Sequence, residues 1–221
     1  MKYIKRPLPI NEEIELSPYK TIMSKTDKKG IIEYANEYFM EVSGYKEWEL
    51  MGQPHNIIRH PDMPKVIFKL LWNKLNEGEP MMAIVKNLSK DGRYYWVIAD
   101  FFSKLDKDGN VISHYARRKA VPNEVKEKIS KLYKILLEIE KNSGIDASQA
   151  YLEGFLEDKS ITYFDLILNL LKLDKKQLHE YMSAEIKDEE FNLSIKDNDI
   201  SINDAIKKSK KKSGFLKKLF K

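Results

Sequence analysis

Cysteine is absent from all 221 residues of the chain. The protein therefore cannot form disulfides, thiolate-ligated zinc sites or iron–sulfur clusters, and it cannot form a flavin–cysteine adduct. No run of roughly 18 apolar residues occurs, so no segment is predicted to span a membrane. Residues 1–7 are basic but lack the apolar stretch of a secretory signal. These absences favour a cytoplasmic protein.

The motifs of common catalytic sites are also missing. The sequence has no HExxH, no Walker A loop, no GxSxG and no GxGxxG. Glu37 and Glu41 fall on one face of an expected helix, but most such pairs of acids are solvated surface. The residues after position 121 are too few for a histidine kinase or cyclase domain. We therefore expect a protein that is not an enzyme.

The positive charge is concentrated at the C-terminal end. No acid follows Asp204, and the last 15 residues contain eight lysines: Lys207, Lys208, Lys210, Lys211, Lys212, Lys217, Lys218 and Lys221. Subtracting these eight from the net charge of +5 leaves residues 1–206 at −3. A basic tail on an acidic body argues against a nucleic-acid-binding face.

Apolar residues are interleaved with these lysines, because Phe215, Leu216, Leu219 and Phe220 fall on one side of a short helix. The pattern allows three interpretations, which the sequence leaves open: contact with an anionic membrane surface, docking on an acidic partner helix, or a solubilising tail.

Five segments have the alternation and flanking turns of β-strands. Residues 21–26 and 31–34 flank a turn at 27–30. Two longer runs, 81–88 and 94–103, flank Asp91-Gly92, a strong hairpin signal, and a fifth at 111–117 follows Asp108-Gly109. Hairpins make the pairing antiparallel, which excludes a doubly wound parallel sheet.

Helices are predicted between the second and third strands. Asn36 is expected to cap a short helix over 37–43 that ends at Gly44. Shorter helices are expected over 46–50 and 54–59, and a longer one is expected to run from Asp62 to Leu75. The resulting α+β fold places helices across one face of a small antiparallel sheet and leaves a pocket between them.

The C-terminal half is predicted to be helical. Val125, Ile129, Leu132, Leu136 and Ile139 repeat with the 3.5-residue period of helix pairing. Residues 142–144 should end this helix, and residues 147–156 should be helical. A further helix is expected to begin at Thr162, with Asp165 completing a capping box, and to reach Met182.

The run 52–64, GQPHNIIRHPDMP, gives the sequence its family likeness. Together with Ala35-Asn36, residues 42–45, residues 85–87 and residues 95–97, it resembles the PAS domain of the Aer-type aerotaxis and energy-taxis receptors. The resemblance implies a PAS fold, a five-stranded antiparallel sheet with short helices on one face, followed here by an α-helical C-terminal region. It divides the chain into an N-terminal cap segment (1–18), a PAS sensor domain (19–121), a helical output region (122–186), and a polar linker with a basic amphipathic tail (187–221).

The resemblance also implies a cofactor, because this family binds FAD noncovalently and uses the redox state of the flavin as its signal. The positions that match the family's cofactor-binding residues are Asn36, Arg59, His60, Asp62, Phe68, Trp72 and Asn87. Arg59 offers a planar fork to a pyrophosphate or a flavin carbonyl. The amide of Asn87 can donate or accept as a flavin nitrogen gains a proton. Trp72 can stack near a planar ring.

The sequence departs from the family in several places. Met81-Met82-Ala83 replaces a tryptophan, a small residue and a glycine, and Ile98 replaces an arginine. The transmembrane segment and coiled-coil hairpin of the membrane-bound members are not found in this sequence. It therefore resembles the soluble half of a split receptor, whose expected partner is a membrane-bound chemotaxis signalling receptor. A homodimer through the PAS domain and contact with the inner face of the membrane through the basic tail are further expectations.

Two other functions compete with this one. A PAS adaptor without a cofactor would use its sheet face and helical region to assemble a complex, and a haem-based gas sensor would use His55 or His60 as an axial ligand. Several site residues also have structural interpretations. Asn36 could serve only as a helix cap, Trp72 could pack in the core, and Arg59 could pair with Asp62.

Overall fold

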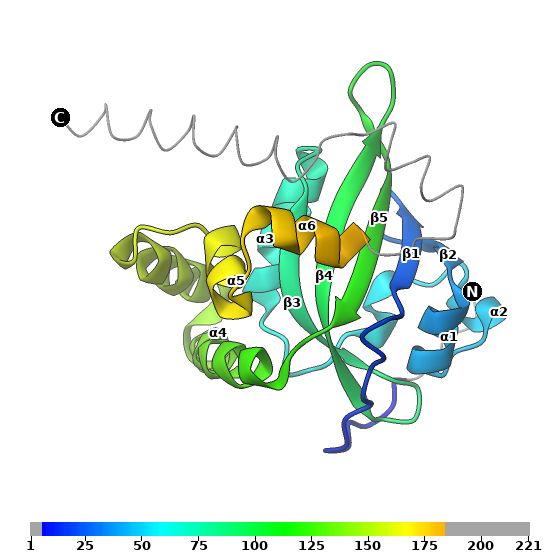
Figure 1. Cartoon of the computed structure of the whole chain (residues 1–221), viewed down its shortest axis with the longest axis horizontal. Coiled ribbons are helices and arrows are strands. Elements are labelled where there is room, and N and C mark those ends of the chain that lie inside the picture. Colours follow the sequence, from blue (N-terminus) through cyan, green and yellow to red (C-terminus); the bar gives the residue numbers. More distant parts are fainter. Residues whose placement is uncertain (1–5, 184–221) are drawn as a thin grey trace.

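The protein is described here from a computed structural model that covers residues 6–183. Five strands and several helices make up this part of the chain (Figure 1). In chain order they are β1 (Ile22–Asp27), β2 (Ile32–Ala35), α1 (Glu37–Ser43), α2 (Glu47–Leu50), the 3-10 helix η1 (His55–Ile58), α3 (Lys65–Asn76), β3 (Met81–Leu88), β4 (Tyr94–Leu105), β5 (Val111–Ala120), α4 (Asn123–Asp158), α5 (Tyr163–Leu171) and α6 (Lys175–Ser183). The predictions for residues 187–221 lie outside the described residues.

The strands form one antiparallel sheet in the order β2-β1-β5-β4-β3. This confirms the predicted five-stranded architecture. β3 occupies the predicted residues, whereas β5 continues past its expected end at Arg117 to Ala120, which pairs with Val97. The basic run 117–119 does not have a strand-like composition. The neighbouring strands β1 and β4 supply the backbone partners that extend it.

The first helix forms as predicted. Asn36 Oδ1 accepts a hydrogen bond from Phe39 N at 3.0 Å, and Gly44 ends the helix in the left-handed region at φ 71°. The expected start of the long helix at Asp62 is wrong, because α3 begins at Lys65. Pro64 immediately precedes it, and proline favours a position at the start of a helix.

The single helix expected from Thr162 to Met182 is also wrong. The capping box of Thr162 and Asp165 forms as predicted, but the chain turns at Lys172, with φ 55°, and a second helix follows. The predicted stop at residues 142–144 appears as a kink in α4, where Gly144 has the non-helical φ of 86°. Residues with a positive φ, such as Lys172 and Gly144, interrupt a helix. The spacing of apolar residues does not reveal such interruptions, so it predicts one continuous helix.

The last three helices pack against the sheet and its β3 edge: α5 contacts β3, α6 crosses β4 and β5 in Figure 1, and α4 lies beside the β3 edge. The ring of Tyr133 on α4 stacks on Trp96 with centroids 6.4 Å apart. Its hydroxyl donates to Ile84 O at 2.6 Å and contacts the hydroxyl of Tyr163 at 2.8 Å. Tyr181 of α6 donates to Ala120 O at 2.9 Å. These contacts hold the helical region and the sheet in one structure.

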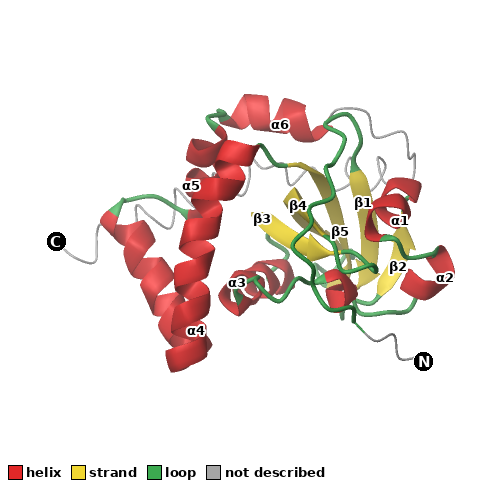
Figure 2. Cartoon of the chain, turned by 90° about the horizontal axis from the view of Figure 1, so that it is seen from below, coloured by secondary structure: helices red, strands yellow, loops and turns green. Residues whose placement is uncertain are grey.

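The apolar residues of α4 that repeat with a 3.5-residue period face the interior of the protein. Val125, Ile129, Leu132 and Leu136 are buried in the same apolar core as α5 and the sheet. α4 therefore pairs with helices of its own chain, α3 and α5, as Figure 2 shows. Within residues 6–183, no helix combines the length and apolar character needed to cross a membrane.

A side chain of α4 also completes the start of α3. Pro64 offers no capping side chain, and the carboxylate of Glu140 accepts hydrogen bonds from Lys65 N at 2.9 Å and Val66 N at 2.8 Å. Free N–H groups at a helix start need such acceptors. The position of α3 on the inner face of the sheet is thus linked directly to α4.

Replacing Tyr133 with phenylalanine should lower the free energy of unfolding by about 1–2 kcal/mol, because a buried carbonyl and the Tyr163 hydroxyl lose a partner. Denaturant titration followed by circular dichroism measures the change. Tyr151→Phe, at an exposed position of the same helix, is the matched control and should change stability little. Equal stability of both variants would contradict the importance of this contact.

Candidate functional site

A cavity of about 140 Å³ lies between the inner face of the sheet and the helices η1 and α3. Strand alternation decides which residues reach it. Ser24 of β1, Asn87 of β3, Phe101 of β4 and Arg118 of β5 all point to the same face of the sheet and line the cavity. The opposite wall comes from residues 54–59 and from one face of α3.

The signature run 52–64 forms this opposite wall because it is fixed to both sides of the sheet. At one side, Ile32 N donates to Gln53 O at 2.9 Å. At the other, Arg59 forms an antiparallel backbone bridge with Asn87 on the edge strand β3. Prolines at both ends of the loop prevent a continuous helix, so only a 3-10 turn forms. The cavity therefore depends on a loop that pairs with the sheet at both of its ends.

Four of the seven predicted residues come together around the cavity: Arg59, Phe68, Trp72 and Asn87. The guanidinium of Arg59 lies over the Phe68 ring, 3.7 Å from its centroid. Within the described part of the chain, Arg59 Nε and Asn87 Nδ2 are buried and have no hydrogen-bond partner. Burying unpartnered donors costs free energy, so these two groups are available to a ligand that brings acceptors.

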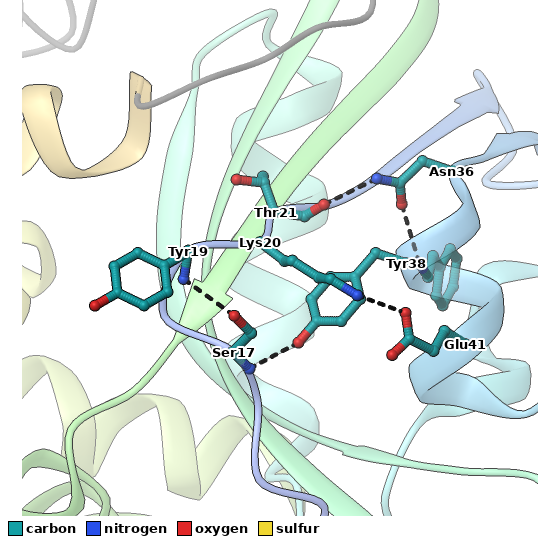
Figure 3. A network of polar contacts seen from close by, with 8 residues as sticks. Ser17, Tyr19, Lys20, Thr21, Asn36, Tyr38 and Glu41 are labelled. Carbon is teal, nitrogen blue, oxygen red and sulfur yellow. Dashed lines mark hydrogen bonds and ion pairs between the residues drawn. The ribbon is translucent and has the colours of Figure 1, made fainter.

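The other three predicted residues lie outside the lining of the cavity. Figure 3 shows Asn36 between the start of β1 and α1, where Nδ2 donates to Thr21 O at 2.8 Å. Its Oδ1 accepts from Met23 N and from Phe39 N, each at 3.0 Å. The Asn36 amide thus uses three hydrogen bonds to the backbone, which cap α1 and link it to the start of β1.

His60 and Asp62 are also engaged locally. His60 Nδ1 accepts from Asp62 N at 3.1 Å, and the carboxylate of Asp62 pairs with Lys86 at 2.9 Å. Asp62 therefore has Lys86 as its partner, and no Arg59–Asp62 ion pair is found among the described residues. Asp62 thus fastens the loop to β3, and the ring of His60 meets Tyr94 of β4 edge-on with centroids 5.9 Å apart.

The sequence interpretation did not include Arg118 or Ser24 in the site, and it considered His55 only as a haem ligand. Arg118 is 3% exposed, and its Nη1 donates to Ser24 Oγ at 2.9 Å. Its Nη2 lies 3.0 Å from His55 Nε2. Burial lowers the pKa of Arg118 to about 10, which still leaves it charged at neutral pH. Burial, and then the charge of Arg118, lowers the pKa of His55 well below its ordinary value, so the imidazole is neutral and its Nε2 accepts.

The neighbouring arginine shows what is unusual about Arg118. Arg117 points to the outer face of the sheet and pairs with Asp100, with Nε 2.7 Å from Oδ2. Arg118 points inward, and among the described residues no aspartate or glutamate lines the cavity with it. Lys29, Arg59 and Arg118 give the lining an unbalanced positive charge. A buried cation without a counter-charge is costly, so the cavity favours a ligand that is anionic or rich in acceptors.

Trp72 and Gly30 narrow the mouth of the cavity. A Cβ on Gly30 would lie 2.8 Å from Cη2 of Trp72, and Gly30 has φ +80°. The indole also meets the ring of His114 edge-on, with centroids 5.4 Å apart. Trp72 can occupy this position only because residue 30 has no side chain.

Comparison with known proteins identifies this arrangement of sheet, loop and helices. Residues 32–115 match the family model described as PAS fold. This part of the chain has the PAS fold. The match spans most of the sheet and all of the signature loop, so the cavity described above lies in the PAS domain.

Known proteins also resemble part of the chain in sequence. The aerotaxis receptor of Escherichia coli (strain K12) is 40% identical over 130 residues, which cover 59% of this chain and 26% of the receptor. The bacterioopsin transcriptional activator of Halobacterium salinarum (strain ATCC 700922 / JCM 11081 / NRC-1) is 30% identical over 95 residues, covering 43% of this chain and 14% of that protein. The chain thus spans about a quarter or less of the length of these curated relatives.

One solved structure is similar in fold to about half of this chain. The dark structure of the blue-light photoreceptor Aureochrome1 LOV is 21% identical, with a TM-score of 0.44, and the alignment covers 54% of this chain and 86% of that one.

The buried histidines of the PAS domain should make its stability depend on pH. Burial lowers the pKa of His60 to about 4, and it also lowers the pKa values of His55 and His114. Between pH 6.5 and 4 the unfolded chain therefore takes up protons that the folded chain does not, and stability falls as the pH falls. His60 alone should contribute roughly 3 kcal/mol over this range.

Denaturant titrations at several pH values test this expectation. His60→Gln should flatten the stability curve between pH 6.5 and 4, whereas His179→Gln, at an exposed position, should keep the slope of the wild-type protein. A His60→Gln curve parallel to that of the wild-type protein would contradict the expected titration.

Proposed function

We propose that this chain is a sensor rather than an enzyme, which binds FAD noncovalently in the PAS cavity and responds to the redox or oxygen state of the cell. The observation that carries the proposal is the cavity's lining. It combines two unpartnered buried donors, Arg59 Nε and Asn87 Nδ2, with an excess of positive charge. The 40% identity to the Escherichia coli aerotaxis receptor over 130 residues supports the same function.

The donor set suits a flavin ring chemically. The ring presents carbonyl oxygens and nitrogens along one edge, and Asn87, Arg59 and Arg118 present donors from three sides of the cavity. An amide such as Asn87 can either donate or accept, so it can remain bonded when a ring nitrogen gains a proton. Bound FAD would supply the group that takes up and releases electrons.

The size of the cavity requires side chains to move. A cavity of about 150 Å³ holds benzene, and pockets for larger ligands have volumes of about 300–1,000 Å³. At about 140 Å³ this cavity is too small for a three-ring system. Phe68, Trp72 and Arg59 line it and are partly exposed, so they can swing outward without disturbing the sheet. We therefore expect the mouth to open when the ring enters.

The proposed output passes through α3 to α4. Phe68 and Trp72 lie on α3, and the first turn of α3 is capped by Glu140 of α4. A second link joins β3 to α4 through Tyr133 and Ile84 O, one residue before the lining residue Val85. In our proposal, displacement of α3 shifts α4 and the helices packed on it. A membrane-bound chemotaxis receptor would read this change.

The basic tail would favour an encounter with such a receptor. Eight lysines after Asp204, interleaved with apolar residues, can associate with anionic lipid, which would place the chain at the inner face of the membrane. This association is a proposal from the sequence, since the tail lies outside the described residues. A cofactor-free adaptor is the alternative that the experiments below distinguish.

Arg59→Ala and Asn87→Ala should each lower the affinity for FAD about tenfold, because each removes a donor that burial makes costly to leave unpaired. Protein purified and reconstituted with FAD should show the two-band flavin spectrum, and titration gives the dissociation constants. Absence of flavin binding after reconstitution would favour the adaptor.

Matched controls are available on the surface. Arg93→Ala removes an arginine paired with Asp91, and Asn142→Ala removes an exposed amide on α4, both away from the cavity. Neither should change FAD affinity. If they weaken binding as much as the cavity variants do, the assignment of Arg59 and Asn87 to the site is wrong.

Tryptophan fluorescence should report opening of the mouth. Of the three tryptophans, Trp72 lines the cavity, whereas Trp96 faces α4 and Trp48 is 66% exposed. Adding FAD should quench the emission, and the quenching should be largely lost in Trp72→Phe but retained in Trp48→Phe. Equal quenching in the two variants would place the flavin away from Trp72.

A further inference from the structure

Three cationic side chains from separate segments meet at the mouth of the cavity. Lys29 from the turn between β1 and β2 and Arg59 from the signature loop line the cavity directly. Arg6 reaches the same rim from the N-terminal segment and donates through Nη2 to the backbone oxygen of Asn56 and to its Oδ1, the latter at 2.8 Å. Asn56 is itself a lining residue. We call Arg6, Lys29 and Arg59 the cationic rim.

The N-terminal segment that carries Arg6 follows a fixed path. Ile10 N donates to Gly92 O at 2.8 Å, and Ile14 N donates to Tyr94 O at 2.7 Å, which holds this segment along the β3–β4 hairpin. Leu8 O passes so close to Gly92 that a Cβ there would lie 2.4 Å away. The first of these hydrogen bonds is made by Ile10, four residues after Arg6. The exposed side chain of Arg6 itself is placed at the rim by its hydrogen bonds to Asn56.

The cationic rim lacks counter-charges. Among the described residues, no ion pair joins Arg6, Lys29 or Arg59 to an aspartate or glutamate, although surface cations such as Lys20 and Lys69 have such partners. Burial, and then the charge of Arg6, lowers the pKa of Arg59, so the two guanidinium groups lie close enough to repel each other. An anion at the rim would remove this repulsion.

We propose that the cationic rim binds the diphosphate of a flavin dinucleotide whose ring occupies the cavity. This inference rests on the proposed function, and it adds a physical reason why the site would bind FAD in preference to FMN or riboflavin. Guanidinium groups match phosphate oxygens in a bidentate geometry, and a lysine adds a point charge. A diphosphate carries enough oxygens for all three cations, whereas FMN offers one phosphate and riboflavin offers none. The rim therefore selects FAD over the smaller flavins.

The selectivity has a second consequence. Because Arg6 belongs to the N-terminal segment, that segment becomes part of the cofactor site and should become more firmly held when FAD is bound. Contacts between its residues 10–14 and the β3–β4 hairpin then connect the rim with the strand that carries Asn87.

Fluorescence titration of the full chain with FAD, FMN and riboflavin tests the rim. The wild-type protein should bind FAD at least about tenfold more tightly than riboflavin, with FMN between them. Arg6→Ala and Lys29→Ala should each lower FAD affinity about tenfold and leave riboflavin affinity unchanged. Raising the salt concentration should weaken FAD binding to the wild-type protein more than to Arg6→Ala, since charge attraction is screened.

Two controls separate a local effect from a folding defect. Lys28→Ala removes the exposed neighbour of Lys29, which does not line the cavity, and should keep wild-type selectivity. Arg6→Lys should recover part of the FAD affinity because it restores the charge without the fork. Unchanged thermal melting of Arg6→Ala would show that the exposed side chain does not support folding.

The outcomes distinguish this inference from the proposed function. If FAD, FMN and riboflavin bind the wild-type protein equally well, the cationic rim does not bind the diphosphate, although flavin binding itself is supported. The same conclusion follows if Arg6→Ala lowers the affinity for riboflavin as much as the affinity for FAD. If none of the three flavins binds after reconstitution, the proposed function fails and this inference fails with it.

Discussion

The backbone bridge between Arg59 and Asn87 is the contact on which the site depends. It fixes the end of the signature loop to the edge strand β3, while Ile32 and Gln53 fix its beginning near β2. The loop thus spans the inner face of the sheet and encloses a cavity that neither element could form alone. It also brings the two unpartnered donors, Arg59 Nε and Asn87 Nδ2, to the place where the wall formed by the loop meets the wall formed by the sheet.

Strand alternation gives this cavity its charge. Arg117 and Arg118 are consecutive residues of one strand, and both are nearly inaccessible to solvent. The first is neutralised by Asp100 on the outer face, whereas the second faces the cavity. There Ser24, His55, the backbone and the rings of Phe39 and Phe101 surround it, with no carboxylate partner among the described residues. An isolated buried charge opposes folding, and in the proposed sensor the bound cofactor would compensate for it. The cationic rim extends the same excess charge to the surface.

The helical region is joined to the walls of the cavity at two points. Glu140 caps α3, and Tyr133 bonds to the backbone of β3, so α4 touches both a wall helix and a wall strand. In the proposed sensor this geometry lets a small displacement around the ring reach α4 without passing through the whole sheet. The match to the aerotaxis receptor covers 26% of the receptor's length, so the identity of the partner is part of the proposal.

Local signals in the sequence determined most of the fold. Asp91-Gly92 and the flanking alternation placed β3 at its observed bounds, Asn36 and Gly44 placed both ends of α1, and Thr162 with Asp165 placed the start of α5. These signals act through residues only a few positions apart, so the linear sequence contains them. The signature run 52–64 indicated the PAS fold through its resemblance to the PAS domain of the Aer-type receptors.

The composition of the site was decided by the tertiary structure. Of the seven residues proposed from the sequence, the cavity gathers Arg59, Phe68, Trp72 and Asn87, and it adds Arg118, which no local pattern distinguishes from Arg117. Which of two neighbouring arginines faces inward depends on the register of β5 between β1 and β4, and register is set by long-range backbone pairing. The sequence by itself thus determined the elements and their order, whereas only the pairing of distant strands decided which side chains share the cavity.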